Sequence, residues 1–199
     1  MRAIRLLVVA SSLILVSAAW ADTFENGMKA YNTLDYDTAF AIWQPLAEGG
    51  DAESQFSLGM MYGNGFGVMM DDAQAIKWYG LAAEQGHPKA LFNLAVMHQN
   101  GWGVPPDEEH ATTLYRAAAD AGEDEAMLAL GRHFSMDFSD AYDPVQAYKW
   151  YSLAALLNAM DAVGKRDAIA SRMSAEQVAE GKALVDAWSK ANGGKLAAD

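Results

Sequence analysis

A block of 36 residues repeats three times in this chain, and this period limits the possible folds more than any other feature. The blocks run over residues 51–86, 87–122 and 123–158, and a partial earlier block shares some of their columns. Equivalent positions carry the same or similar residues, as in the columns Leu58/Leu94/Leu130 and Ala82/Ala118/Ala154. Such a period is typical of a solenoid, whose units bury their apolar faces only against their neighbours.

Each block has the residue spacing of two amphipathic helices. In the second half of the first full block, Ala75, Trp78, Tyr79, Ala82 and Ala83 recur at helical intervals and define one face. The first half of each block places apolar and small residues at the same kind of interval. Small residues let helices approach closely while aromatic rings fill the remaining space. The pattern therefore predicts an all-α solenoid of antiparallel helix pairs.

Polar residues and glycines mark where these helices begin and end. An aspartate precedes each second helix and is expected to accept hydrogen bonds from its free N–H groups. These aspartates are Asp35, Asp71, Asp107 and Asp143. A residue that tolerates a left-handed backbone follows each second helix. These residues are Gly50, Gly86, Gly122 and Asn158.

The motif Leu58-Gly59-x-x-Tyr62-x-x-Gly65-x-Gly67-Val68, followed by Trp78-Tyr79-x-x-Ala82-Ala83-x-x-Gly86, resembles the repeat of the Sel-one-like repeat family. That family is related to the tetratricopeptide repeat proteins, and the resemblance covers residues 24–158. It implies a right-handed α-solenoid that works as a protein-interaction scaffold. The third block departs from the family's pattern, because Met136–Asp140 replaces the glycine-rich link between the two helices.

The N-terminal segment has the pattern of an export signal. Arg2 and Arg5 precede a short apolar run, Leu6–Val16, and Ala19-Trp20-Ala21 offers a small-x-small cleavage site. We therefore predict a signal peptide over residues 1–21, cleavage before Asp22 and a periplasmic location, with secretion as the second choice. The apolar run is too short to span a bilayer as a helix, so no membrane span is expected after cleavage.

The repeat array is expected to occupy residues 22–158, and the period fades after Asn158. The sequence Ser174-Ala-Glu-Gln177 forms a capping box that predicts one more helix, ending near Asn192. Solenoids need terminal units that shield their last apolar surface. We interpret residues 159–199 as C-terminal capping helices followed by a tail.

Composition narrows the class of partner. The chain has no cysteine, so it can form no disulfide. Removing Arg2 and Arg5 with the signal peptide would change the formal net charge from −12 to about −14. An acidic chain without clustered Lys and Arg is unsuited to nucleic acid and to anionic lipid surfaces. We expect a partner that is a neutral or basic protein or peptide.

No catalytic motif is present in the sequence, which lacks a cysteine nucleophile and the serine, zinc and phosphate-loop signatures of common enzyme classes. We expect no catalytic, cofactor or metal site. Copper at Met61, Met97 and His133 is disfavoured because equivalent residues of stacked helices lie about 10 Å apart. Calcium at the acidic loop Met136–Asp143 is disfavoured because the loop lacks the spacing of a calcium-binding loop. An envelope hydrolase of the β-lactamase type, or a metal-handling protein, remains the alternative.

The resemblance also implies a binding surface. In tetratricopeptide arrays the groove is lined by first-helix residues that point away from the partner helix, on the concave face. Carried over position by position, this rule selects Glu53, Phe56, Met60, Asn64, Lys89, Phe92, Val96, Asn100, Glu125, Leu128 and Arg132. Phe56 and Phe92 are expected to be aromatic anchors that the core does not need. The alternative is that both rings pack between neighbouring repeats.

Overall fold

The computed structural model describes residues 23–137 and 139–192, which contain ten α-helices and no β-strand. The predicted signal peptide lies outside the described residues, as do residues 193–199. The helices are α1 (Phe24–Asn32), α2 (Tyr36–Glu48), α3 (Ala52–Asn64), α4 (Asp72–Glu84), α5 (Pro88–Asn100), α6 (Glu108–Asp120), α7 (Asp124–Ser135), α8 (Pro144–Leu156), α9 (Ala162–Ala170) and α10 (Ala175–Ala191).

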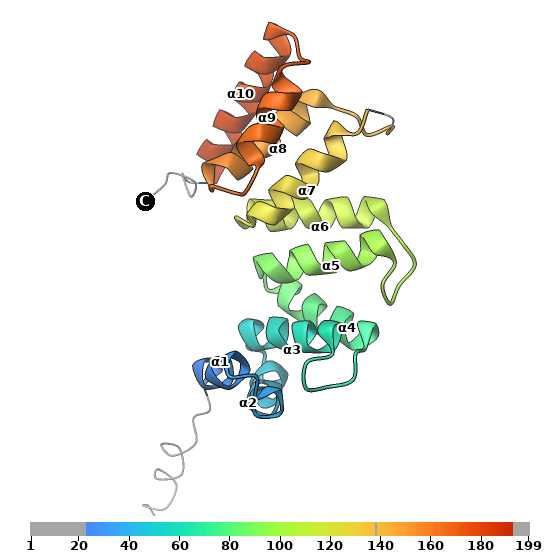
Figure 1. Cartoon of the computed structure of the whole chain (residues 1–199), viewed down its shortest axis with the longest axis vertical. Helices are drawn as coiled ribbons and strands as arrows, with labels where there is room; N and C mark the ends of the chain where they lie inside the picture. The colour runs from blue at the N-terminus through green and yellow to red at the C-terminus, as the bar shows by residue number, and fades with distance from the viewer. Residues whose placement is uncertain (1–22, 138, 193–199) are drawn as a thin grey trace, which may run out of the picture.

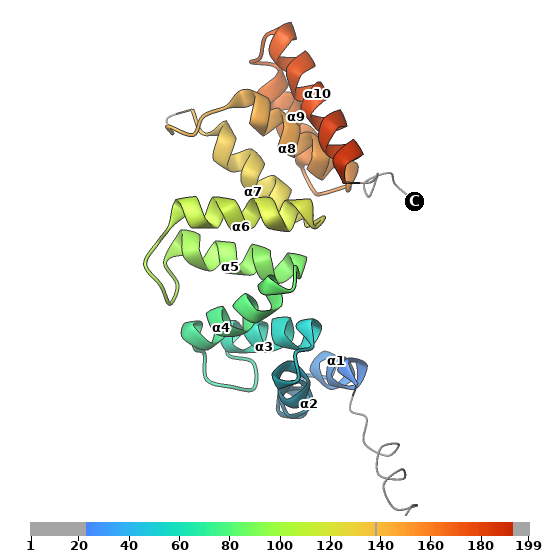
Figure 2. The same ribbon diagram turned by 180° about the vertical axis from the view of Figure 1, so that it is seen from behind.

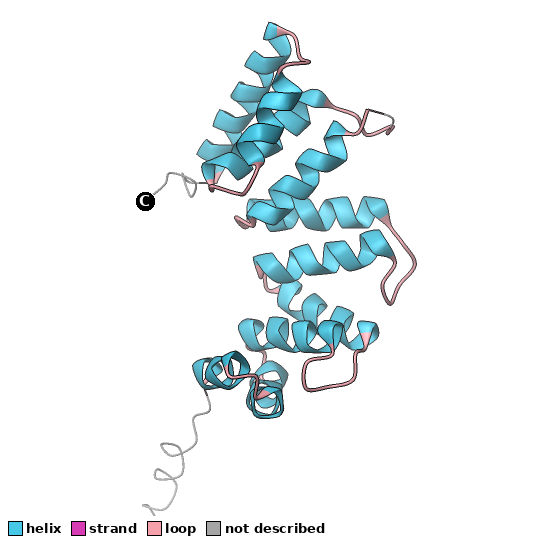
Figure 3. Ribbon diagram, viewed as in Figure 1, coloured by secondary structure: helices cyan, strands magenta, loops and turns pink. Residues whose placement is uncertain are grey.

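Consecutive helices pack as antiparallel pairs, α1 with α2, α3 with α4, α5 with α6 and α7 with α8, and the pairs stack along the long axis of the molecule (Figures 1 and 3). The links between the helices of the last three of these pairs lie along one edge of the stack, as both views show (Figure 2). This arrangement confirms the predicted all-α solenoid.

Within a pair, a small residue of the first helix lies against an aromatic ring of the second. A Cβ atom added to Gly59 would lie 2.5 Å from the ring of Tyr79, and one added to Gly131 would lie 2.5 Å from the ring of Tyr151. Gly27 lies against Trp43 in the same way, and α5 carries a buried alanine, Ala95, at this position. The missing or minimal side chain lets the two helices approach closely, and the ring fills the space between them.

The predicted alanine columns form the centre of the core. Ala82, Ala118 and Ala154 have no exposed surface, and neither do Leu58 and Leu130. Neighbouring repeats share this core, since buried residues from α5 to α10 belong to one continuous apolar cluster. Each repeat therefore relies on the next to cover its apolar face, as expected for a solenoid.

The predicted helix caps are confirmed at both ends. Asp71 Oδ1 accepts from the Gln74 backbone N–H at 3.0 Å, and Asp35, Asp107 and Asp143 cap α2, α6 and α8 in the same way. Gly50, Gly86 and Gly122 follow the second helices with φ of +97°, +80° and +98°, and Asn158 takes φ of +58°. These left-handed residues end each second helix and turn the chain into the next repeat.

The C-terminal helices cover the end of the array. The buried indole of Trp188 in α10 donates to Asp120 Oδ1 at the end of α6, with a distance of 2.7 Å. Gly181 lies against Tyr148 of α8, so α10 packs across the last repeat. The capping box of Ser174 and Gln177 is present at the start of α10, as the sequence predicts.

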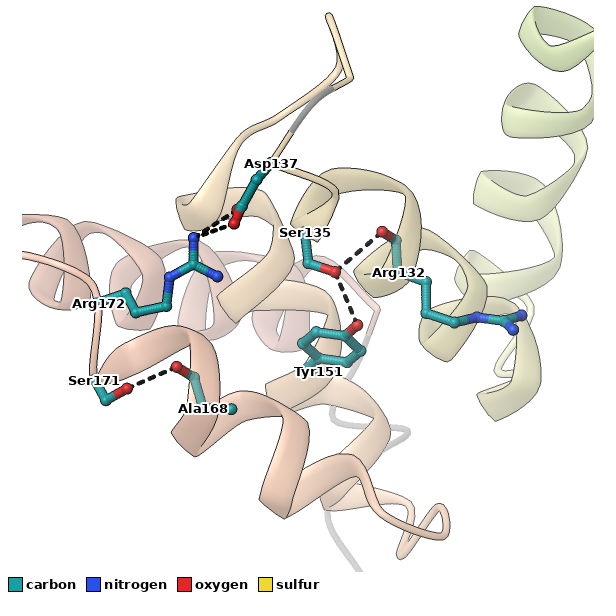
Figure 4. Close-up of polar contacts among 7 residues, drawn as sticks. All are labelled: Arg132, Ser135, Asp137, Tyr151, Ala168, Ser171 and Arg172. Atoms are coloured by element: carbon teal, nitrogen blue, oxygen red, sulfur yellow. Dashed lines mark hydrogen bonds and ion pairs between the residues drawn. The ribbon is translucent and has the colours of Figure 1, made fainter.

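Two carboxylates of the acidic loop between α7 and α8 form interactions within the chain. Asp143 caps α8, as expected, by accepting from the backbone N–H groups of Val145 and Gln146. Asp137 forms an ion pair with Arg172 at 2.6 Å (Figure 4). This ion pair ties the loop to the segment between α9 and α10, which sequence spacing does not reveal.

The buried alanine columns make a stability prediction. Ala118→Leu adds three carbon atoms at a fully buried helix crossing, so we expect it to lower the free energy of unfolding by about 1–3 kcal/mol through overpacking. Thermal unfolding followed by circular dichroism measures this change. Glu109→Gln at the exposed start of α6 is the control, and an equal loss of stability in both variants would show that the repeat register is wrong.

Candidate binding surface

The eleven residues predicted to bind a partner all lie on the first helices α3, α5 and α7. The polar ones are exposed, and these are Glu53, Asn64, Lys89, Asn100, Glu125 and Arg132. The apolar ones are half-buried, and these are Phe56, Met60, Phe92, Val96 and Leu128. We call these eleven residues the first-helix strip. The strip has the composition of an interface, with apolar residues bordered by polar ones.

The two phenylalanines of the strip also take part in packing, contrary to the expectation that the core does not need them. The ring of Phe56 stacks on His87 with centroids 4.7 Å apart, and it lies 5.8 Å from the ring of Tyr79. The ring of Phe92 lies 5.7 Å from that of Tyr115. Because His87 begins the next repeat, Phe56 connects two repeats, as the alternative interpretation requires, whereas the contact of Phe92 with Tyr115 lies within one repeat.

His87 also caps the helix that follows it. Its Nδ1 atom accepts from the Ala90 backbone N–H at 3.1 Å and so caps α5. Its Nε2 atom lies 3.4 Å from Glu53 Oε2, on the first helix of the preceding repeat. The histidine thereby connects the cap of one repeat to the strip of another.

A pocket of about 310 Å³ opens between α3 and α5 within the strip. Three residues of the strip line it, namely Met60, Asn64 and Val96. Its other lining residues are Gly63, Asp72, Tyr79, Asn93, Met97 and Trp102, which sequence reasoning did not select. We call this the first pocket.

The space of the first pocket is filled one repeat earlier by two aromatic residues of α1 and α2, and these have no aromatic counterpart in α3 and α4. One repeat earlier, Phe66 of the α3–α4 link stacks on Tyr36 of α2 at 5.1 Å and lies 6.1 Å from Tyr31 of α1. Trp102 occupies the position of Phe66 one period later. Asp72 is the first residue of α4, as Tyr36 is of α2. Gly63 lies four residues after Gly59, as Tyr31 lies four residues after Gly27, so Asp72 and Gly63 take the positions of the two tyrosines.

The consequence is an aromatic residue without its expected stacking partners. Trp102 is 52% exposed, in contrast to the half-buried Phe66. The glycine-rich link still folds back on the preceding repeat, because Gly103, with φ of +71°, lies against Asp72. The link therefore holds Trp102 at the rim of a pocket that its neighbours do not fill.

A second pocket, of about 220 Å³, lies one repeat further along, between α5 and α7. It is lined by Gln99, Ala129, Arg132, His133 and Met136. The first four of these residues follow Gly63, Asn93, Val96 and Met97 by one period of 36 residues. The pocket therefore recurs with the repeat while its lining side chains change. We call this the second pocket.

The two pockets differ in charge. Asp72 is the charged residue in the lining of the first pocket, and burial raises the pKa of the neighbouring Tyr79 to about 12, so that its phenol stays neutral. The second pocket is lined by Arg132 and His133. Glu108 occupies the position of Asp72 one period later, but its Oε1 lies 3.3 Å from His133 Nδ1.

The residues considered for metal binding lie in different surroundings. Met61 and Met97 are buried in the core, whereas His133 is half-buried beside Glu108. Sequence reasoning did not select the acidic cluster at the start of α7, where carboxylate oxygens of Glu123, Asp124 and Glu125 lie within 4.8 Å of one another. Among the described residues, this is the one cluster of three ligand-type side chains found at such distances.

The pKa values of two residues in the acidic cluster are strongly shifted. Burial, together with the adjacent Glu125, raises the pKa of Glu123 to about 8. Hydrogen bonding from its two acidic neighbours lowers the pKa of Glu125 to about 2. Glu123 precedes α7 at the repeat position that Asp51 and His87 occupy before α3 and α5. Those two side chains cap their helices, but the Glu123 side chain makes no capping hydrogen bond. At neutral pH the cluster therefore retains a proton.

This cluster predicts a pH-dependent stability. The pKa of Glu123 is raised above its ordinary value of 4.5, so the stability that its protonated form contributes is complete below about pH 4.5 and is lost as the pH rises towards 8. Glu123→Gln keeps the shape without the charge. We expect its melting temperature to exceed that of the native chain at pH 8, by a margin that shrinks as the pH falls to 4.5.

Calorimetric scans of both proteins from pH 4.5 to 8 measure this margin. Glu109→Gln, at an exposed position, is the control for the loss of one acidic residue. A margin that stays constant across this range would contradict the raised pKa of Glu123.

Comparison with known proteins identifies the repeat from which the helix pairs are built. The Sel1 repeat family profile matches residues 52–87, 88–123 and 124–158. A Sel1 repeat protein from Oxalobacter formigenes is 36% identical, with a TM-score of 0.57, over 63% of this chain and 94% of that one. No similar protein was found among curated proteins.

A second solved structure shows the fold alone. It is a protective antigen of uropathogenic Escherichia coli strains that displays an SLR fold, with a TM-score of 0.53 and 24% identity. The similarity covers 79% of this chain but 42% of the antigen, so this chain spans less than half of that protein. The matched repeats coincide with the helix pairs α3/α4, α5/α6 and α7/α8, and the chain belongs to the Sel1 repeat family.

Proposed function

We propose that this protein is a non-enzymatic scaffold that binds a segment of another protein along the first-helix strip. The observation that carries the proposal is the pair of pockets that recur with the repeat period along the first helices, each lined in part by residues of the strip. Stacked repeats create the extended binding surfaces that solenoid proteins use. Sel1 repeats generally mediate protein interactions, which supports this choice.

The apolar residues of the strip suit this function because they are accessible but already ordered. Met60 contacts the Tyr31 hydroxyl through its sulfur at 3.9 Å, and Val96 packs against the core of the neighbouring repeats. Side chains that are held in place before binding lose little conformational entropy when a partner covers them. The flexible, polarizable thioether of methionine adapts to different apolar partner groups.

The proposed location is the periplasm, on the basis of the signal-peptide pattern at residues 1–21. No helix in residues 23–137 and 139–192 is long and apolar enough to cross a membrane. The mature protein would then act in the cell envelope, in signalling, secretion or surface polysaccharide systems. The intact mass of the protein recovered from the periplasmic fraction tests this location. A mass that includes residues 1–21 would contradict it.

The scaffold function predicts which variants lose their partner. The double variant Met60→Ser with Val96→Ser removes apolar surface on both sides of the first pocket, so we expect it to capture at least about tenfold less partner than the native chain. Capture by immobilised protein from cell-envelope extract, quantified by mass spectrometry, measures this loss.

Leu81→Ser provides a matched control, because Leu81 is an exposed apolar residue of the second helix α4, outside the strip. Thermal unfolding of each variant shows whether it is folded at the temperature of capture. Equal capture by the folded double variant and the control would exclude the strip as the binding surface.

A further inference from the structure

The two equivalent pockets carry opposite charges, and this difference indicates which residues a bound partner would place in them. Asp72 lies in the first pocket and Arg132 in the second, although both pockets are built from equivalent positions of successive repeats. Within residues 23–137 and 139–192, the side chains of Asp72 and Arg132 form no ion pair. Each pocket therefore presents a charge that the described part of the chain does not neutralise.

The first pocket has the chemistry to hold a cationic side chain. The Asp72 carboxylate can accept hydrogen bonds from an ammonium or guanidinium group. The half-exposed indole of Trp102 offers a π face to the same cation, and Met60 and Val96 can cover the methylene groups of a Lys or Arg side chain. Apolar walls with an acid and an indole at the rim fit a long basic side chain better than a purely apolar one.

The second pocket has the chemistry to hold a carboxylate. Arg132 is exposed, and its guanidinium extends away from the contact between Ser135 and Tyr151 (Figure 4). Gln99, which lines the pocket, accepts from the Tyr115 hydroxyl through its Oε1 atom at 2.9 Å, and its amide N–H groups can serve as donors. Glu108, which could compete for Arg132, lies against His133 instead. The pocket thus offers N–H donors and a positive charge.

Resting on the scaffold function above, we propose that the bound segment is an extended peptide with a Lys or Arg side chain in the first pocket and an Asp or Glu side chain in the second. The first helices of successive repeats contact each other much less than directly packed helices do, so they lie farther apart than the usual packing distance of about 8–10 Å. An extended chain advances about 3.3 Å per residue. The basic and acidic residues of the partner are therefore more than about three positions apart, in an order set by the direction of the peptide.

A displayed library of random 12-residue peptides, selected on immobilised protein of residues 22–199, tests this proposal. The native chain is expected to enrich peptides with a basic and an acidic residue at one fixed separation, in one order. The charge-swapped variant, Asp72→Lys with Arg132→Glu, is expected to enrich the reversed order and to bind the native chain's peptides about tenfold more weakly.

Matched variants keep the result interpretable. Glu180→Lys with Lys182→Glu swaps two exposed charges on α10 and should enrich the same order as the native chain. Thermal unfolding establishes that each variant is folded. If the swapped protein does not fold, Asp72→Asn and Arg132→Gln replace it, and each is expected to remove the selection for one of the two charges.

The outcomes separate this proposal from the scaffold function. Selected peptides whose binding is lost in the Met60→Ser and Val96→Ser variant, but which carry no such charge pattern, would overturn the charge assignment and leave the scaffold function standing. If the native and charge-swapped proteins enrich peptides with the same order of basic and acidic residues, the charge assignment is also overturned. Failure to enrich any peptide would contradict the peptide-binding scaffold itself.

Discussion

The close contact between a small residue and an aromatic ring within each helix pair sets the geometry on which the rest of the structure depends. Gly59 against Tyr79 and Gly131 against Tyr151 fix how near the two helices lie. The alanine columns then let successive pairs stack at the same close distance. Since each pair is built alike, any space left on the first helices recurs with the period of the chain.

This regular scaffold makes small changes in sequence functionally important. Tyr31 and Tyr36 fill the space beside Phe66, whereas Gly63 and Asp72 leave the equivalent space beside Trp102 open. The backbone need not change, because the glycine-rich link folds on the preceding repeat in both places. Binding specificity can therefore vary from repeat to repeat while the core stays the same.

Local features of the fold could be predicted from the sequence, and distant contacts could not. Helix caps such as Asp71 and the capping box of Ser174 depend on residues three positions apart, so their spacing is sufficient. The hydrogen bond from Trp188 to Asp120 joins residues 68 positions apart and has no spacing signal. The family rule located Met60 and Val96, but the role of Trp102 depends on which side chains are missing around it.

The central claim is that partners bind on the first helices and not on the second. A photo-reactive amino acid at position 96, in the first pocket, tests it in living cells when compared with the same group at position 81 on α4. The account predicts that irradiation joins position 96 to a defined partner protein and leaves position 81 without it. Crosslinking of that partner at position 81 with equal or greater yield would contradict the account.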